Sequence, residues 1–321
     1  MVRVDESYNL ADDKQAVKIQ SSTRDTDKAA NKIIRPYQGM VALPSICMGF
    51  GVVFSFLTVV TLGAMGIIPL WLGLVLNCLV LYAAQTPLHE ACHGNIAGRK
   101  GELMWLNHLI GYLCGYVLLH EYKAFRHLHL AHHRETNDEI LDPDHWVKVD
   151  NPWVALFRCC TIVFYYNHFF FKTVIFQSHD PVKRKLALHV IASFWALYAL
   201  MFWLAVTGWW AEVLMLWLLP HYIASALIIY FFAYLVHQPH KETERYRDTN
   251  LFLFKGSLSK FITWAYCFQN YHLIHHLYPR IPFYLYPEAF RDVRPLLEKE
   301  NAPITEFEGL ELNTGQQEHQ L

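Results

Sequence analysis

The sequence predicts an all-α protein that crosses a membrane several times, with four transmembrane helices in two hairpins and a histidine-rich cap on the cytosolic side. Two observations predict the membrane class. Of the 321 residues 54% are hydrophobic, and two long regions carry almost no charge. The third observation, which predicts the cap, is that many of the 19 histidines gather in short clusters. The net charge of -1 argues against a nucleic-acid partner, which requires a concentrated basic surface.

The first hairpin follows a polar segment. Residues 1–39 mix acidic and basic side chains and are expected to form a polar N-terminal tail. From Val41 to Leu88 the chain has no charged residue, and this region is long enough for two spans of about 20 residues each. We therefore expect two transmembrane helices joined by a short turn at residues 63–69.

The second hairpin is expected between Leu186 and Val236, with its turn at residues 207–212, where tryptophans mark the membrane interface. All 27 Lys and Arg residues lie outside the two short turns between paired spans. The positive-inside rule therefore places the tail, the middle loop and the C-terminal region together on the cytoplasmic face. Two aromatic stretches, Leu103–His120 and Pro152–Phe176, contain polar residues, and we expect them to be interfacial or half-inserted helices.

Residues 89–93 read HEACH, which matches H-E-x-x-H. In metalloproteases of that signature two histidines bind zinc and the glutamate acts as the base. The motif therefore has two interpretations, a protease or another kind of metal site.

Two further histidine clusters favour the second interpretation. The second cluster reads HLAHH over residues 129–133 and the third reads HLIHH over residues 272–276. Residues three and four apart share one face of a helix, so each cluster can direct its imidazoles at one point. Two more histidines, in HQPH, follow the fourth predicted span: His237 and His240.

Eight to ten imidazoles exceed the needs of one catalytic zinc, which takes three protein ligands and water. Two metals with four or five nitrogens each would use them all, and imidazole suits iron, zinc and copper alike. The clusters follow apolar helices, so the substrate is expected to be lipid-derived. A redox-active pair of ions can activate dioxygen against an unactivated C–H bond, whereas zinc cannot.

The three clusters, in this order and separated by paired spans, resemble the membrane fatty acid desaturase and hydroxylase superfamily. The stretches FRHLHLAHH, LDPDHW and QNYHLIHHLYPRIPFY are most similar to its carotene hydroxylase branch, and acyl desaturases share the same clusters. The resemblance implies a non-haem centre of two iron ions within a membrane-embedded oxidase domain at residues 40–300, followed by a polar tail at residues 301–321.

The resemblance also assigns roles to residues. It implies nine histidine ligands: His89, His93, His129, His132, His133, His237, His272, His275 and His276. His240 is a less secure candidate. Glu90 is expected to orient a ligand histidine. Asp142, Asp144 and Asn270 are expected to support ligands or to position water, although Asp142-Pro143-Asp144 also fits a simple turn.

The implied reaction uses dioxygen, two electrons and a lipid-soluble long-chain substrate within membrane lipids. The sequence contains no G-x-G-x-x-G fingerprint, so an external ferredoxin or a reductase and cytochrome system is expected to supply the electrons. Its docking site is expected among basic residues of the cytoplasmic face, which otherwise contact lipid: Lys183, Arg184, Lys185, Arg280, Arg291 and Arg294.

Three alternatives remain at this level. The substrate is either a fatty acyl chain, which ranks slightly ahead, or a carotenoid ring. A membrane zinc protease would use His89, Glu90 and His93 and leave six clustered histidines unused. A metal transporter or haem carrier would place its histidines within the spans, where only His189 and His221 lie.

Overall fold

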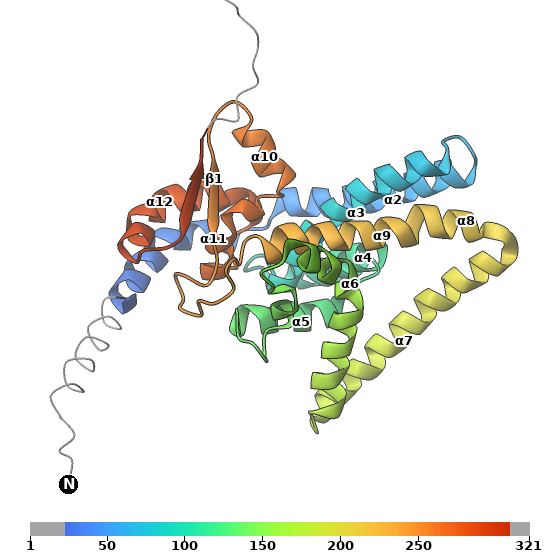
Figure 1. The fold of residues 1–321 in the computed structure, drawn as a ribbon, viewed down its shortest axis with the longest axis horizontal. Helices are drawn as coiled ribbons and strands as arrows, with labels where there is room; N and C mark the ends of the chain where they lie inside the picture. Colours follow the sequence, from blue (N-terminus) through green and yellow to red (C-terminus); the bar gives the residue numbers. More distant parts are fainter. Residues whose placement is uncertain (1–22, 309–321) are drawn as a thin grey trace, which may run out of the picture.

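The computed structural model describes residues 23–308 and is mostly helical (Figure 1). The outer parts of the two expected tails, residues 1–22 and 309–321, lie outside the described residues. The α-helices and the two strands, in chain order, are α2 (Leu43–Ala64), α3 (Leu70–His93), α4 (Met104–Val117), α5 (Tyr122–Arg134), α6 (Pro152–Phe171), α7 (Pro181–Leu204), α8 (Trp210–Val213), α9 (Leu219–Ile229), β1 (Leu251–Phe254), α10 (Ser259–Ala265), α11 (His272–Leu277), α12 (Tyr286–Lys299) and β2 (Ile304–Phe307).

Helices α2 and α3 form the first predicted hairpin. Both are long and apolar enough to cross a membrane, and they pack along each other. Gly73 of α3 makes room for a neighbouring helical segment, because a Cβ there would lie 2.4 Å from Leu216 Cδ2. The predicted pair of spans between Val41 and Leu88 is confirmed.

The second predicted hairpin is one helical stretch, Pro181–Tyr234, that reverses at a single glycine. Gly208 has a φ of 107°, which a residue without a Cβ adopts at little cost. Helix α7 therefore folds back toward α8 and α9, as Figure 1 shows in yellow and orange. The turn falls within the predicted residues 207–212.

Helix α6 differs from the expected half-inserted segment. With its π-helical extension it runs from Pro152 to Phe176, and this length and composition also suffice to cross a membrane. Its polar side chains have partners inside the protein: Arg158 donates to the carbonyl of Trp146 at 2.8 Å, and Asn167 donates to the carbonyl of Val163 at 2.8 Å. These hydrogen bonds offset the cost of burying the side chains that had argued against a span. The other expected interfacial stretch contains α4, and α5 follows it at an angle of 101°.

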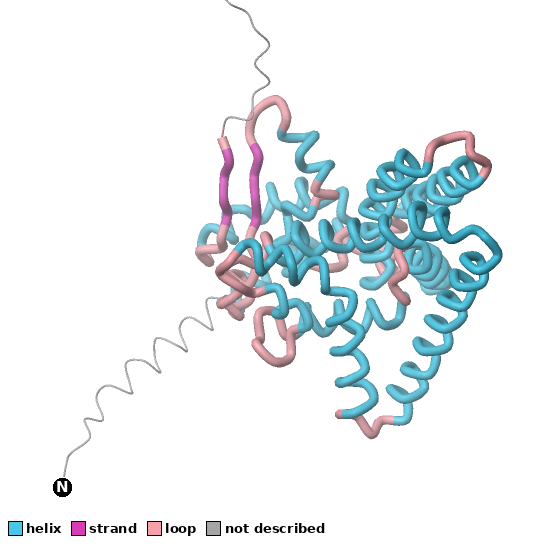
Figure 2. Tube along the Cα trace, turned by 45° about the vertical axis from the view of Figure 1, so that its right-hand side comes forward, coloured by secondary structure: helices cyan, strands magenta, loops and turns pink. Residues whose placement is uncertain are grey.

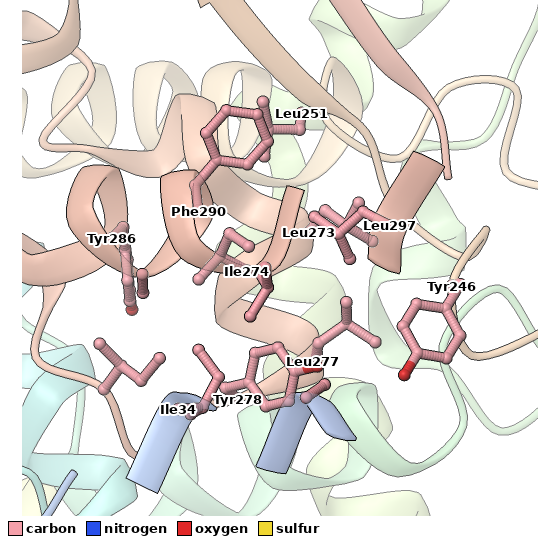
Figure 3. Close-up of a cluster of buried hydrophobic side chains, with 14 of the residues drawn as sticks. Ile34, Tyr246, Leu251, Leu273, Ile274, Leu277, Tyr278, Tyr286, Phe290 and Leu297 are labelled. Atoms are coloured by element: carbon pink, nitrogen blue, oxygen red, sulfur yellow. The ribbon is translucent and has the colours of Figure 1, made fainter. Parts of the chain in front are cut away.

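The cap is built from both ends of the described chain. A helix over residues 23–34 places Ala30 and Ile34 in a buried core with α11 and α12, although the sequence predicted only a polar tail there (Figure 3). Residues of the expected C-terminal tail form β2, which pairs in parallel with β1, as Figure 2 shows in magenta. The cap therefore has its own hydrophobic core, on which the third histidine cluster lies.

Candidate metal centre

Three helices and one connecting segment carry the clustered histidines. Helix α3 ends at His93 because Gly94 takes a left-handed φ of 76°, which leaves the first cluster on the last turns of the helix. The second cluster lies on α5, whose first turn is capped by Glu121. The third lies on α11, which directs Leu273, Ile274 and Leu277 into the cap core and leaves its histidines on the other face.

Five histidines meet in the first group, with one ligand nitrogen of each lying within 4.8 Å of the others. His89 Nε2 lies 2.9 Å from His275 Nε2, and His133 Nε2 lies 2.8 Å from the same atom. His93 Nε2 lies 2.7 Å from His129 Nε2. The group therefore combines α3, α5 and α11, three segments that are far apart in the sequence.

Four histidines meet in the second group under the same 4.8 Å limit: His132, His237, His272 and His276. His237 Nε2 lies 3.0 Å from His272 Nε2, and His132 Nε2 lies 3.3 Å from His276 Nε2. The groups are neighbours, since the rings of His133 and His276 stack with centroids 4.2 Å apart. The structure thus brings together all nine histidines that the sequence singled out.

The donor set fits two transition-metal ions. An imidazole nitrogen binds such an ion at about 2.1 Å, so nitrogens on opposite sides of one ion are about 4 Å apart, within the spread of each group. Burial lowers the pKa well below its usual value for the histidines of the cap and its connecting segment, which keeps them in the neutral form that metals bind: His237, His272, His275 and His276.

Four of the ring nitrogens that point away from the groups have close partners of their own, whereas the buried His89 Nδ1 has none within the described residues. Asp142 Oδ1 lies 2.8 Å from His132 Nδ1, and Gln269 Oε1 lies 2.9 Å from His272 Nδ1. Tyr286 OH lies 3.0 Å from His275 Nδ1, and the carbonyl of Asp248 lies 3.3 Å from His237 Nδ1. Such outer hydrogen bonds fix ring orientation in metal sites.

The acidic turn after α5 also changes the basicity of one ring. Burial lowers the pKa of His132, but Asp142 and Asp144 more than offset this effect and raise it to about 9. A more basic imidazole is a stronger donor to a metal. Asp144 has a second contact, since it accepts a hydrogen bond from the Tyr166 hydroxyl.

Two predicted supporting residues do not contact the histidines. Glu90 is fully buried, and within the described part of the chain its side-chain partners are Ser45 Oγ at 3.2 Å and Asn95 Nδ2 at 3.0 Å. On a helix it lies about 100° around from His89, so it joins α3 to α2 rather than orienting a ligand. It is therefore also poorly placed to act as a protease base.

Asn270 is the second residue, because its side chain donates to the carbonyl of Phe252 at 3.0 Å and so ties the segment before α11 to β1. Its predicted role in positioning water stays a prediction. The histidine partner is the preceding residue, Gln269, which the sequence analysis missed. His240, the less secure candidate, lies outside both groups, with Nε2 3.0 Å from the carbonyl of Tyr234.

A narrow cavity of about 50 Å³ adjoins both groups. His89 and His129 from the first group and His132 and His272 from the second form one side of it. The other walls are mostly apolar and come from α5, from α9 and from the π-helical segment Tyr230–Tyr234 that follows it: Phe125, Leu128, Ile228, Ile229, Phe232 and Ala233. The cavity therefore places apolar side chains directly beside four of the nine imidazoles.

Comparison with known proteins agrees with this geometry. The sequence profile of the family described as fatty acid desaturase matches residues 36–308. This chain belongs to the fatty acid desaturase family. The family implies non-haem iron, and the two histidine groups agree with such a metal.

Individual relatives are distant. The chain is 25% identical over 244 residues to a fatty acid conjugase of Calendula officinalis, and this match covers 65% of this chain and 63% of the relative. It is 25% identical over 230 residues to the dihydrorhizobitoxine desaturase of Bradyrhizobium elkanii, with 64% and 62% covered. It is 26% identical over 166 residues to the sn-1 oleoyl-lipid 12-desaturase of Synechocystis sp., with 44% of each covered. The matches therefore span between 44% and 63% of the length of these relatives.

Proposed function

We propose that this family member is a dioxygen-dependent oxidoreductase that oxidises an unactivated C–H bond of a long alkyl chain, with fatty acyl desaturation as its reaction. The observation that carries the proposal is the position of an apolar cavity against both histidine groups. The relatives are described as a conjugase and as desaturases, which favours removal of hydrogen from a chain over hydroxylation of a carotenoid ring.

The nine histidines are proposed to hold two iron ions, one in each group. Bound iron would supply the activation of dioxygen and the oxidising power for C–H cleavage. The protein's own residues position this chemistry. Asp142, Gln269 and Tyr286 hold ligand rings in place, and Phe125 and Leu128 keep water away from the chain. Asp144 and Tyr166 line the same cavity and provide a pair that can hold or pass a proton.

An external electron donor completes the balance. Forming one double bond removes two hydrogens from the chain, and reducing dioxygen to two waters takes two further electrons and two protons. We propose that an acidic ferredoxin or cytochrome docks beside His93, where a cavity of about 190 Å³ is lined by Arg99 and Arg280. That face is proposed to be the cytoplasmic one, following the distribution of Lys and Arg.

The test is metal analysis combined with lipid profiling. Protein purified from iron-supplied cells is expected to contain about two irons per chain, and the host membranes are expected to gain an unsaturated acyl chain, measured by gas chromatography and mass spectrometry. His275→Ala should lower both values, whereas His179→Ala, an exposed histidine outside both groups, should change neither. One zinc per chain, or hydroxylated carotenoid with unchanged acyl chains in a carotene-producing host, would overturn the proposal.

A further inference from the structure

A second cavity lies beyond the one at the metal centre. It has a volume of about 40 Å³ and shares three wall residues with the first cavity: Phe125, Leu128 and Tyr166. The two cavities are therefore neighbours that these three residues separate. Phe125 lies between them, with its ring stacked on His129 at 5.7 Å on one side and on His120 at 5.8 Å on the other.

The far cavity has a polar end, although it lies among membrane helices. His120 and Glu121, from the turn between α4 and α5, line it together with Asn167 of α6. Glu121 is only 3% exposed. Its Oε2 accepts from the backbone N–H of Ala124, whereas its buried Oε1 forms no hydrogen bond within the described residues. Ionisable groups at such a depth are costly and generally mark a functional site.

His120 offers a second buried atom that forms no hydrogen bond within the described residues. Its Nε2 lies 3.3 Å from Ser225 Oγ, which in turn lies 3.4 Å from His221 Nδ1. Its Nδ1 is buried and has no hydrogen-bond partner within residues 23–308. The serine hydroxyl can either donate to His120 Nε2 or accept from it. His120 Nδ1 can therefore donate a hydrogen bond to a ligand when it carries the ring proton, and accept one when Nε2 carries it.

The charge around Glu121 selects an uncharged ligand. His189 Nε2 lies 3.4 Å from Glu121 Oε1 and also contacts the hydroxyl of Tyr112. Lys123 Nζ lies near the same tyrosine, 5.9 Å from its ring centre. Lys123 is thus a cation close to the carboxylate, and bringing a further cation out of water would cost more than bringing a hydroxyl.

We propose that the far cavity binds a hydroxyl group carried by the alkyl-chain substrate. The hydroxyl donates to Glu121 Oε1 and pairs with His120 Nδ1, while the carbon to be oxidised lies in the first cavity beside the histidines. The inference rests on the proposed oxidation of an alkyl chain and narrows its substrate class to chains with a hydroxyl remote from the reacting carbon.

The test measures binding without turnover. Purified iron-loaded protein in detergent micelles is titrated with 1-hexadecanol or with hexadecane, and its melting temperature is followed. We expect 1-hexadecanol to reach its half-maximal effect at about a tenfold lower mole fraction, the loss typical of one unmade hydrogen bond in a buried site. His120→Phe removes one of the two hydrogen-bond partners of the hydroxyl and should lower this ratio. Asn77→Leu, which removes a buried amide that donates to the carbonyl of Leu216 outside both cavities, should leave the ratio unchanged.

Equal effects of the two probes on the wild-type protein would overturn the inference, and so would an unchanged preference in His120→Phe. The wild-type comparison decides even if that variant does not fold. Oxidation of acyl chains is measured in separate samples. Absence of any oxidised chain would refute the proposed function, and absence of a preference for the alcohol would refute only the hydroxyl site.

Discussion

Replacing Asp142 by asparagine should weaken iron binding at the second group alone. The carboxylate accepts three hydrogen bonds: Oδ1 accepts from His132 Nδ1 at 2.8 Å and from the backbone N–H of Asp144 at 2.8 Å, and Oδ2 accepts from the backbone N–H of Asn137 at 2.7 Å. An asparagine in its better orientation keeps the first two bonds and turns an NH2 group toward the third donor.

The expected magnitude follows from these contacts. The NH2 group of the asparagine and the backbone N–H of Asn137 are both donors, and placing them together costs about 1–3 kcal/mol. The turn relieves this repulsion by shifting away from His132. The lost charge also makes the His132 ring less basic. Together we expect iron affinity at that group to fall about 10- to 100-fold, equivalent to about 1.4–2.8 kcal/mol, as for other outer partners of metal-binding histidines.

The assay is iron content after equilibration at a series of buffered free iron concentrations. Wild-type protein should retain two ions and Asp142→Asn one ion at intermediate concentrations. Asp138→Asn is the matched control, because Asp138 caps the backbone of Ile140 and Leu141 and touches no ligand histidine. Loss of both ions together, or retention of both with unchanged affinity, would refute the assignment of Asp142 to the second group.

Three further changes test other parts of the structure. Gln269→Leu removes the acceptor for His272 and should lower iron affinity at the second group about tenfold by the same equilibration assay, with unchanged affinity counting against the contact. Glu90→Leu should leave iron content at the wild-type value but lower the melting temperature, because the buried Ser45 hydroxyl loses its acceptor at a cost of about 1–3 kcal/mol; loss of metal would contradict the position of Glu90. Phe125→Ala should join the two cavities and broaden the range of chain lengths oxidised, measured by product profiling, and an unchanged range would show that this ring does not separate them.

The parts of the fold that follow from local rules were predictable. Absence of charge located the spans, and helical spacing grouped the histidines, because both properties are read from neighbouring residues. The choice between Gln269 and Asn270 was not predictable. It depends on a 3-10 turn at Gln269–Tyr271 that directs the first side chain back to His272 and the second toward β1.

Contacts between distant segments were also beyond the sequence. Tyr286 reaches His275 only because α12 packs on α11, and β2 forms only by pairing with β1, which lies about fifty residues earlier in the chain. The error on Glu90 differs in kind. The rotation of about 100° between adjacent helical residues already turns Glu90 away from the face that carries His89. The prediction followed the H-E-x-x-H motif and did not take this rotation into account.

The mixed origin of each histidine group determines when the centre can assemble during biosynthesis. Each group draws at least one ring from α11, so neither is complete before the ribosome has passed residue 276. By then the hairpin helices α2, α3, α7 and α9 have all been synthesised. Acquisition of the proposed metal ions would therefore be a late event in maturation, and translation products that stop before α11 would lack part of both histidine groups.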